Sequence, residues 1–368
     1  MGPIYVWQKS DWPNFIWDSE QLLEDLGQAR KLQGKILGFA NFVGLEAQAN
    51  LLAEEAMTTS AIEGEKLNKD SVRSSVARRL GLSTSGLPPQ QREIDGLIEM
   101  LMDATSNHQS RLTAKRLFGW QAALFPTGFS GLRKIAVGTW RKGTQPMQVI
   151  SGRLGKEKIH FEAPPSSQVA KEMKAFFDWW EGPSKKLDGI IRAGIAHFWF
   201  VTIHPFEDGN GRIARAITDM ALAQDEQTGC RFYSLSSQIV FERNAYYDIL
   251  EASQKKNSDL TLWLKWFLKM FCLAIEKSEG VVAKALNIAR FWQLHNQAEF
   301  NSRQIKIINR LLEAEPEGFE GGMTNRKYVG LTKVSRETAK RDIAELEEKG
   351  VLKRNSGKGR SISYSLSF

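Results

Sequence analysis

Cysteine is scarce in this chain and long apolar runs are missing, and each absence excludes a class of protein. Only Cys230 and Cys272 occur among the 368 residues, too few for the disulfide framework of a small secreted domain. No segment has the roughly eighteen consecutive apolar residues that a membrane-spanning helix needs. The first residues lack the basic and apolar segments of a secretory signal. We therefore expect a cytoplasmic protein without a membrane partner.

Histidine is also rare, and its positions do not indicate a metal site made of His and Cys. His108, His160 and His295 show no metal-ligand spacing, and neither cysteine pairs with them. His197 lies in an apolar segment, where we expect a buried histidine with a structural role. The remaining histidine, His204, opens the most informative segment of the chain.

Positive charge is concentrated at one end of the sequence. From Asn301 to the last residue the chain has 14 Lys and Arg against 9 Asp and Glu, which is +5 of the total net charge of +8. An excess of this kind favours an acidic partner, with nucleic acid as the first candidate. A solvated basic surface without a partner fits the charge nearly as well.

His204 begins the stretch His-Pro-Phe-Glu-Asp-Gly-Asn-Gly-Arg-Ile-Ala-Arg, which ends at Arg215. A histidine side chain can accept a proton near neutral pH and so can act as a general base. Asp208 supplies a hard oxygen ligand of the kind that Mg²⁺ takes alongside substrate phosphates. The first half of the stretch therefore combines a proton acceptor with a magnesium ligand.

The second half of the stretch has the parts of an anion site. Gly209, Asn210 and Gly211 tolerate positive φ, so successive backbone N–H groups can point into one concavity. Arg212 and Arg215 are three residues apart on an expected helix, so both guanidinium groups lie on one face near its positive end. Together the two halves predict a site for nucleotide phosphates with a proton acceptor beside it.

This stretch resembles the signature of the Fic family, His-Pro-Phe-x-(Asp/Glu)-Gly-Asn-Gly-x-x-x-Arg, and every fixed position is filled. Residues 197–203 resemble the helix that leads into the motif. Members of the family are mostly adenylyltransferases. The resemblance therefore implies transfer of AMP from ATP, with Mg²⁺, to a Ser, Thr or Tyr hydroxyl of a target protein and to the enzyme itself.

The resemblance also implies a role for each residue of the motif. His204 accepts the proton of the target hydroxyl, and Asp208 holds Mg²⁺. The side chain of Asn210 and the backbone N–H groups around it hold the α-phosphate. Arg212 serves the β-phosphate, and Arg215 serves the γ-phosphate.

A second motif, Thr59-Ser-Ala-Ile-Glu63-Gly64, resembles the inhibitory motif of the family, (Ser/Thr)-x-x-x-Glu-(Gly/Asn). Thr59 and Glu63 are four residues apart, so both face the same side of a helix. The resemblance implies that Glu63 pairs with Arg215 and so prevents or misdirects ATP binding. The alternative is an ordinary surface glutamate before a glycine that ends a helix.

The segment from Arg243 to Leu250 resembles a family helix with two adjacent tyrosines, the second of which lies near the adenine. The resemblance implies that Tyr247 and, two turns later, Gln254 line the adenine pocket. For Tyr246, packing in the core is at least as good an interpretation.

The resemblances imply a mainly α fold, in which a Fic helical core with a β-hairpin flap follows a helical module and precedes a winged helix-turn-helix domain. We expect four parts: residues 1–93 with the inhibitory helix, 94–277 as the Fic domain, 278–299 as a linker helix and 300–368 as the winged helix. Residues 131–138, 147–150 and 158–161 have the alternation of strands. The flap, from Met147 to Phe161, is expected to dock the protein substrate by β-augmentation.

The pattern of residues 300–368 predicts three helices followed by two short strands. Arg336, Lys340 and Arg341 are expected on the recognition helix, with Lys358 and Arg360 on the wing. Such domains bind DNA or mediate protein contacts, and both interpretations stay open here.

Other functions are compatible with the same motifs. A glutamate placed like Glu63 can also orient water, so the enzyme could remove AMP from a modified target or do both. A DNA-binding regulator with an inactive Fic core is the non-enzymatic alternative, and a homodimer is also open. A kinase-type relative is disfavoured because its loop lacks the Gly-Asn-Gly segment found here.

Overall fold

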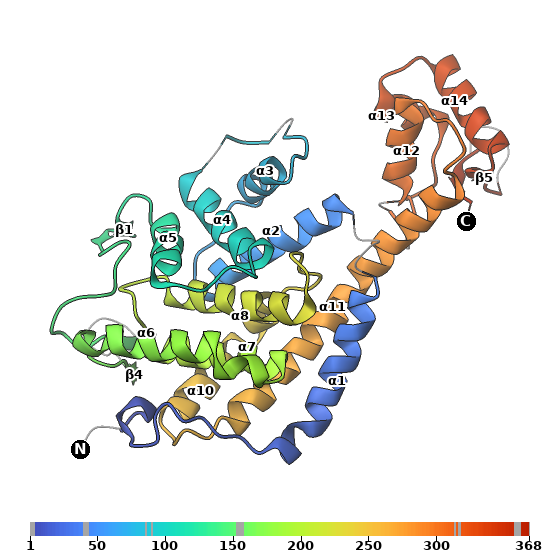
Figure 1. Cartoon of the computed structure of the whole chain (residues 1–368). Coiled ribbons are helices and arrows are strands. Elements are labelled where there is room, and N and C mark those ends of the chain that lie inside the picture. The colour runs from blue at the N-terminus through green and yellow to red at the C-terminus, as the bar shows by residue number, and fades with distance from the viewer. Residues whose placement is uncertain are drawn as a thin grey trace. The chain divides into compact units, whose positions relative to one another are not determined.

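The computed structural model describes residues 4–39, 44–84, 87–89, 91–151, 158–312, 314–315, 318–356 and 362–367. Over these residues the chain is mainly helical, with three small antiparallel hairpins (Figure 1), which confirms the predicted fold class. The chain divides into two compact units, residues 1–38 with 45–278 and residues 39–44 with 279–368.

The first unit contains most of the helices of the described residues. It begins with η1 (Val6–Gln8), α1 (Ser19–Leu37), α2 (Leu45–Ile62) and α3 (Lys69–Arg79). It continues with α4 (Arg92–Ser106), α5 (Ala114–Leu124), α6 (Ser166–Glu181), η3 (Pro183–Lys186), α7 (Gly189–Ile203), α8 (Asn210–Glu226), α9 (Leu235–Phe241) and α10 (Arg243–Gln254). Helix α11 (Thr261–Leu294) runs from this unit into the second.

Local signals set two boundaries of the N-terminal helices. Helix α1 begins at Ser19, and its N-cap is Asp18, which accepts hydrogen bonds from the N–H groups of Glu20 and Gln21. Helix α2 extends to Ile62. It stops there because Gly64 adopts a φ of 86°, a conformation that glycine adopts without strain.

Helix α7 lies at the centre of the first unit and sets the position of the site at its C-terminal end. Its residues 190–203 are all buried, as expected for a helix that is apolar on every side. Gly194 allows α11 to approach closely, because a Cβ there would lie 2.9 Å from a methyl carbon of Leu264. The indole N–H of Trp263 donates to the Gly194 carbonyl at 2.8 Å, which fixes this contact.

The hairpins only partly follow the predicted strands. Strands β3 (Gln148–Ser151) and β4 (Lys158–Glu162) pair antiparallel, with Val149 opposite Phe161, and form the flap hairpin. Residues 152–157 of the expected flap lie outside the described residues. The expectation of one strand over residues 131–138 was wrong, since β1 (Phe129–Ser130) and β2 (Arg133–Lys134) form a separate two-residue hairpin.

The second unit has the predicted order of three helices and a hairpin: α12 (Ser302–Leu312), α13 (Asn325–Thr332), α14 (Arg336–Glu348), β5 (Leu352–Arg354) and β6 (Tyr364–Leu366). The hydroxyls of Thr324 and Ser335 cap α13 and α14. The predicted wing residues Lys358 and Arg360 lie outside the described residues.

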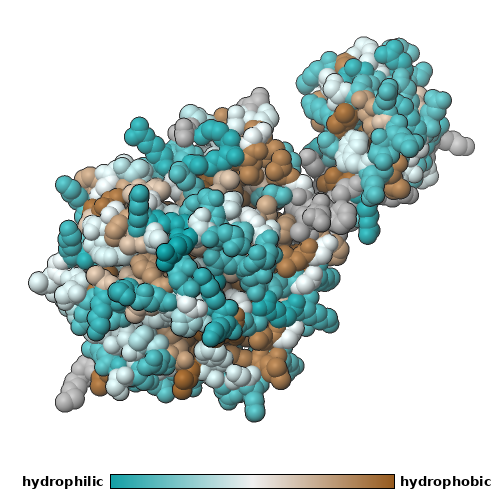
Figure 2. All heavy atoms as spheres, viewed as in Figure 1, coloured by the Kyte–Doolittle hydropathy of each residue, from teal (hydrophilic) through white to brown (hydrophobic). Residues whose placement is uncertain are grey.

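Within the described residues, every helix is too short or too polar to cross a bilayer. The face of the molecule in Figure 2 is mostly hydrophilic, with apolar residues scattered between polar ones.

Candidate functional site

His204 occupies the turn that ends α7, with φ 51° and ψ 59°. Its N–H donates to the Phe200 carbonyl at 3.0 Å, so the last turn of the helix holds it in this left-handed conformation. The side chain lines a cavity of about 830 Å³. The cavity is bounded by the flap hairpin, the loop after His204 and α10, with lining residues that include Gln148, Asp208, Gly211, Tyr247 and Gln254.

The protonation state of His204 follows from its surroundings. Nδ1 lies 3.2 Å from the Val201 carbonyl oxygen, which can only accept, so Nδ1 carries the proton and Nε2 keeps the lone pair. Burial is the main cause that lowers the pKa of His204 to about 4. The imidazole is therefore neutral near pH 7, the form that a general base requires.

Arg141 holds the backbone around His204, a role that the sequence did not reveal. Its Nε donates to the His204 carbonyl at 2.7 Å, and its backbone N–H donates to the Pro205 carbonyl at 2.9 Å. The side chain is buried, and this burial lowers the pKa of Arg141 to about 10. A guanidinium that satisfies the carbonyls at the end of α7 fits the negative end of the helix dipole.

The loop between α7 and α8 is closed by Asn210. Its side-chain oxygen accepts from the Phe206 N–H, and its side-chain nitrogen donates to the Phe206 carbonyl, both at 2.9 Å. Asn210 is buried, so its side chain is engaged in the loop itself. Gly209, with φ 87°, packs where a Cβ would lie 3.0 Å from the Phe125 ring, so this turn requires glycine.

Asp208 lies on the wall of the same cavity as His204. One carboxylate oxygen accepts from the Gly209 N–H at 2.6 Å, and the other accepts from the Ser130 hydroxyl on β1. Each oxygen keeps a further lone pair. No group of three or more His, Cys, Asp or Glu residues within the described ranges could hold a metal. A bound Mg²⁺ would therefore take its other ligands from phosphates and water, which is its usual preference.

Arg212 and Arg215 are both buried in the first turns of α8. Arg212 lies with its guanidinium 5.1 Å from the Phe125 ring centroid. Two of their N–H groups, Arg212 Nε and Arg215 Nη1, are buried without a hydrogen-bond partner. Buried unpaired donors are costly, and a phosphate oxygen is the kind of group that would satisfy them. The arginines therefore fit a nucleotide phosphate chain.

The ion pair expected from the second motif is present. Glu63 Oε1 lies 2.7 Å from Arg215 Nη2. Thr59 contributes twice, since its hydroxyl accepts from Arg215 Nε at 2.6 Å and its carbonyl accepts from Nη2 at 3.0 Å. A Cβ on Gly211 would lie 2.1 Å from Glu63 Oε1, so the carboxylate rests directly on the glycine turn. Glu63 lines the cavity in front of Arg215.

The two expected adenine-pocket residues, Tyr247 and Gln254, both line this cavity. Tyr246 is buried and binds Nε2 of His197 through its hydroxyl at 2.9 Å. Tyr246 and His197 therefore belong to the core, which is one of the interpretations that the sequence offered for Tyr246 and the one expected for His197. Arg243, which the sequence did not single out, donates to the Ile62 carbonyl at 2.6 Å and so anchors the end of α2 to α10.

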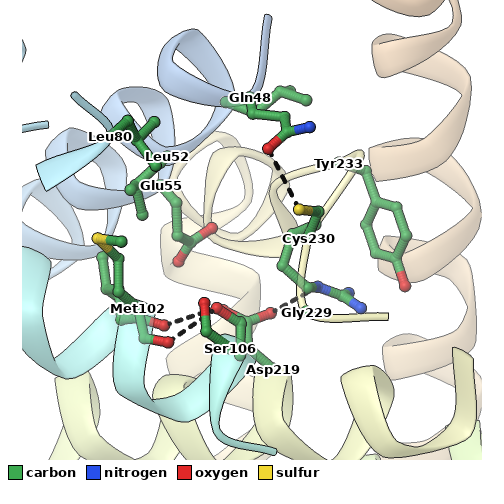
Figure 3. Close-up of a pocket in the computed structure, with 14 residues that line it drawn as sticks. Gln48, Leu52, Glu55, Leu80, Met102, Ser106, Asp219, Gly229, Cys230 and Tyr233 are labelled. Carbon is green, nitrogen blue, oxygen red and sulfur yellow. Dashed lines mark hydrogen bonds and ion pairs between the residues drawn. The ribbon is translucent and has the colours of Figure 1, made fainter. Parts of the chain in front are cut away.

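A buried acidic cluster connects α2 and α8 behind the site. Glu55 of α2 and Asp219 of α8 both reach into a cavity of about 80 Å³ (Figure 3). Glu55 accepts a hydrogen bond from the Ser234 hydroxyl at 2.6 Å. Asp219 lies 3.5 Å from Arg231 Nε. Burial, and after it the charge of Glu55, raises the pKa of Asp219 to about 8.

This raised pKa predicts a pH-dependent stability. Since the ordinary value is 3.8, the folded chain keeps a proton between about pH 4 and about pH 8 that the unfolded chain has released. The free energy of unfolding should therefore fall as pH rises, by roughly 2 kcal/mol between about pH 6 and about pH 8. Asp219→Asn should remove this decline. Urea unfolding of both proteins across this range gives the difference, and parallel curves would contradict the assignment.

Three family models match the chain. A domain of unknown function (DUF4172) matches residues 5–82, the Fic/DOC family matches residues 111–222, and a DeoR-like helix-turn-helix domain matches residues 320–364. The Fic/DOC match contains both His204 and the two arginines of α8.

Curated relatives match a short part of the sequence. Protein adenylyltransferase fic-1 of Caenorhabditis elegans is 35% identical over 78 residues, which is 20% of this chain and 15% of the relative. Protein adenylyltransferase Fic of Nematostella vectensis is 34% identical over 79 residues, which is 21% of this chain and 18% of the relative. The chain thus spans less than a fifth of the length of either relative.

Solved structures share the fold over much longer ranges. A Fic family protein from Desulfovibrio desulfuricans G20 has a TM-score of 0.57 at 17% identity, covering 94% of this chain and 96% of that chain. Fic-1 of C. elegans has a TM-score of 0.51 at 20% identity, covering 72% of this chain and 74% of that chain. The chain therefore shares its fold with these two Fic proteins, and its match to the Fic/DOC family lies between a DUF4172 match on the N-terminal side and a DeoR-like helix-turn-helix match on the C-terminal side.

Proposed function

We propose that this chain is a protein adenylyltransferase that moves AMP from ATP to a hydroxyl of a target protein, and that Glu63 inhibits it. One observation carries the proposal: His204, Asp208 and Gly211 line a single cavity together with Glu63, whose carboxylate is paired with Arg215. Relatives that bear the name adenylyltransferase match part of the chain. We propose that this chain has the adenylyltransferase activity that those names state.

The reaction requires a proton acceptor and groups that bind the phosphates. The target hydroxyl oxygen attacks the α-phosphorus and forms the new O–P bond, while the bond to the β-phosphate oxygen breaks and pyrophosphate leaves. His204 Nε2 takes the hydroxyl proton, since its lone pair is available. Arg212, Arg215 and the N-terminal N–H groups of α8 bind the phosphates and orient them.

Asp208 would hold the Mg²⁺ ion, which supplies charge neutralisation at the phosphates when bound. The hydrogen bonds from Ser130 and Gly209 fix the carboxylate in the cavity wall. Tyr247 and Gln254 line the cavity, and we propose that they contact the adenine. The flap hairpin is the element on which we expect a target segment to dock, because Ile150 and Ile159 are exposed on it.

The target can be identified with a form of the enzyme that lacks the inhibitory carboxylate of Glu63. The Glu63→Gly protein, incubated in a cell lysate with ATP labelled in the α-phosphate, should label itself and a small set of proteins. Mass spectrometry of these proteins should locate AMP on a Ser, Thr or Tyr. Removal of AMP is the alternative activity, and it would appear instead as loss of label from a pre-modified target.

DNA binding by the second unit is a second proposed function, and the DeoR-like match favours it. Arg336, Lys340 and Arg341 are exposed on the N-terminal half of α14, the part of a recognition helix that enters the major groove. The buried face of the same helix belongs to the core of the unit, with Ala339, Ile343 and Leu346.

This proposal predicts salt-dependent binding of the full-length chain to duplex DNA. If Arg336 and Lys340 contact phosphates, the Arg336→Ala/Lys340→Ala protein should lower the slope of log affinity against log salt by about 2. Fluorescence anisotropy over a salt series measures the slope. If the two proteins have equal slopes, Arg336 and Lys340 of α14 do not contact DNA phosphates. If neither protein binds DNA at low salt, protein contacts are the role of this unit.

A further inference from the structure

A second carboxylate of the inhibitory segment, Glu65, reaches the other phosphate-binding arginine. Glu65 Oε2 lies 2.9 Å from Arg212 Nη1, and the Arg212 side chain is 7% exposed. Glu65 lies outside the Thr-x-x-x-Glu-Gly pattern. The two acidic residues thus contact the two arginines separately, Glu63 with Arg215 and Glu65 with Arg212.

The backbone after α2 holds both carboxylates in place. Ser60 accepts hydrogen bonds at its carbonyl from the N–H groups of Glu63 and Glu65, at 3.1 Å and 3.0 Å. Gly64, between them, has a φ of 86°, which turns the chain back after the helix. Because Arg243 also binds the Ile62 carbonyl, the segment is anchored to α10 as well as to its own helix.

The contact with Glu65 differs in kind from the contact with Glu63. In the first pair, the side chain of Arg215 is 2% exposed and that of Glu63 is 31% exposed. In the second pair, the side chain of Arg212 is 7% exposed and that of Glu65 is 48% exposed. Arg212 Nε also stays buried and unpaired while Nη1 is paired. A phosphate could therefore still approach Arg212, but it would meet a guanidinium whose charge is partly neutralised.

We infer that Glu65 is a second inhibitory residue that weakens binding of the β-phosphate at Arg212, while Glu63 acts on the γ-phosphate at Arg215. The inference rests on the proposed function, in which the two arginines bind the phosphates, and on the assignment of the β-phosphate to Arg212 and the γ-phosphate to Arg215 that the family resemblance implies. It predicts that the two carboxylates discriminate between nucleotides. Glu63 should oppose ATP more than ADP, and Glu65 should oppose every nucleotide that has a β-phosphate, including ADP.

Isothermal titration calorimetry on the full-length protein with Mg²⁺ tests this division, using ATP, ADP and AMP as ligands. Glu65→Gln and Glu63→Gln remove one charge each and keep the side-chain shape. Glu46→Gln, at an exposed position in the first turn of α2, is the matched control. Glu65→Gln should tighten ADP and ATP by about threefold to tenfold, since the pair is partly exposed, and should leave AMP unchanged.

The outcomes separate this inference from the proposed function. If Glu63→Gln tightens ATP while Glu65→Gln matches the control for ADP and ATP, the inference is overturned and the proposed function stands. If Glu65→Gln tightens AMP as much as ADP, the effect is one of overall charge and the inference is likewise overturned. If every variant fails to bind all three nucleotides, the proposed function is overturned and the inference with it.

Discussion

Replacement of Glu63 by glycine should raise AMP transfer by about tenfold to a hundredfold at low ATP concentration. The reason is the charge-assisted contact of 2.7 Å between Glu63 and Arg215, an interaction worth about 1.5–3 kcal/mol in a buried setting. Without the carboxylate, the charge of Arg215 is no longer neutralised and can pair with the γ-phosphate, although its hydrogen bonds to Thr59 remain. Incorporation of label from α-labelled ATP into the protein itself measures the effect.

Two further variants show that the effect belongs to this carboxylate. Glu63→Gln keeps the length of the side chain and removes its charge, so it should raise transfer in the same direction. Glu46→Gln, exposed at the other end of α2, should behave like the unchanged protein. Equal labelling of the Glu63 variants and the control would show that Glu63 does not inhibit.

Replacement of His204 by alanine in the Glu63→Gly protein should lower transfer by about a hundredfold to ten-thousandfold, the usual range for loss of a general base. Nucleotide affinity should change little, because the phosphates are bound by α8. The same α-label assay measures the rate, and calorimetry with ATP measures the affinity.

The fold should survive this change, which keeps the experiment interpretable. His204 lies at the end of α7, and the Arg141 contacts to this loop are made to backbone carbonyls that alanine retains. Circular dichroism and thermal unfolding should therefore match the parent protein. Persistent transfer in a folded variant would show that another group accepts the proton.

The sequence was sufficient for those parts of the site that depend on short-range spacing. The interval of four residues between Thr59, in the last turn of α2, and Glu63, directly after this helix, places both on the same side, and both contact Arg215. The glycine turn before α8 likewise follows from Gly209 and its positive φ. The helix order and the C-terminal hairpin were also predicted, since apolar periodicity and capping residues mark them.

Residues that act through long-range contacts were missed. Arg141 is 63 positions from the carbonyl it holds, and Arg243 is 181 positions from its partner Ile62. A single sequence does not reveal such pairings. The Asp219 cluster was missed for the same reason, because Glu55 and Asp219 meet only when α2 packs beside α8.

Glu65 shows a different limit of the motif. Its position two residues after Glu63 was visible, but its reach to Arg212 depends on the turn at Gly64. The domain boundaries and the roles assigned to Asn210, Tyr247 and Gln254 stay predictions. For Asn210 in particular, the side chain is engaged with Phe206, which leaves its backbone N–H as the group available to a phosphate.

The most direct test of the account compares two labels in one nucleotide. The Glu63→Gly protein is incubated with Mg²⁺ and with ATP that is labelled either in the α-phosphate or in the γ-phosphate, and the protein-bound label is counted. If His204 directs attack at the α-phosphorus, label from the α-phosphate should stay on the protein and label from the γ-phosphate should leave with pyrophosphate. Retained γ-label, or no retained label from either position, would contradict adenylyl transfer at this site.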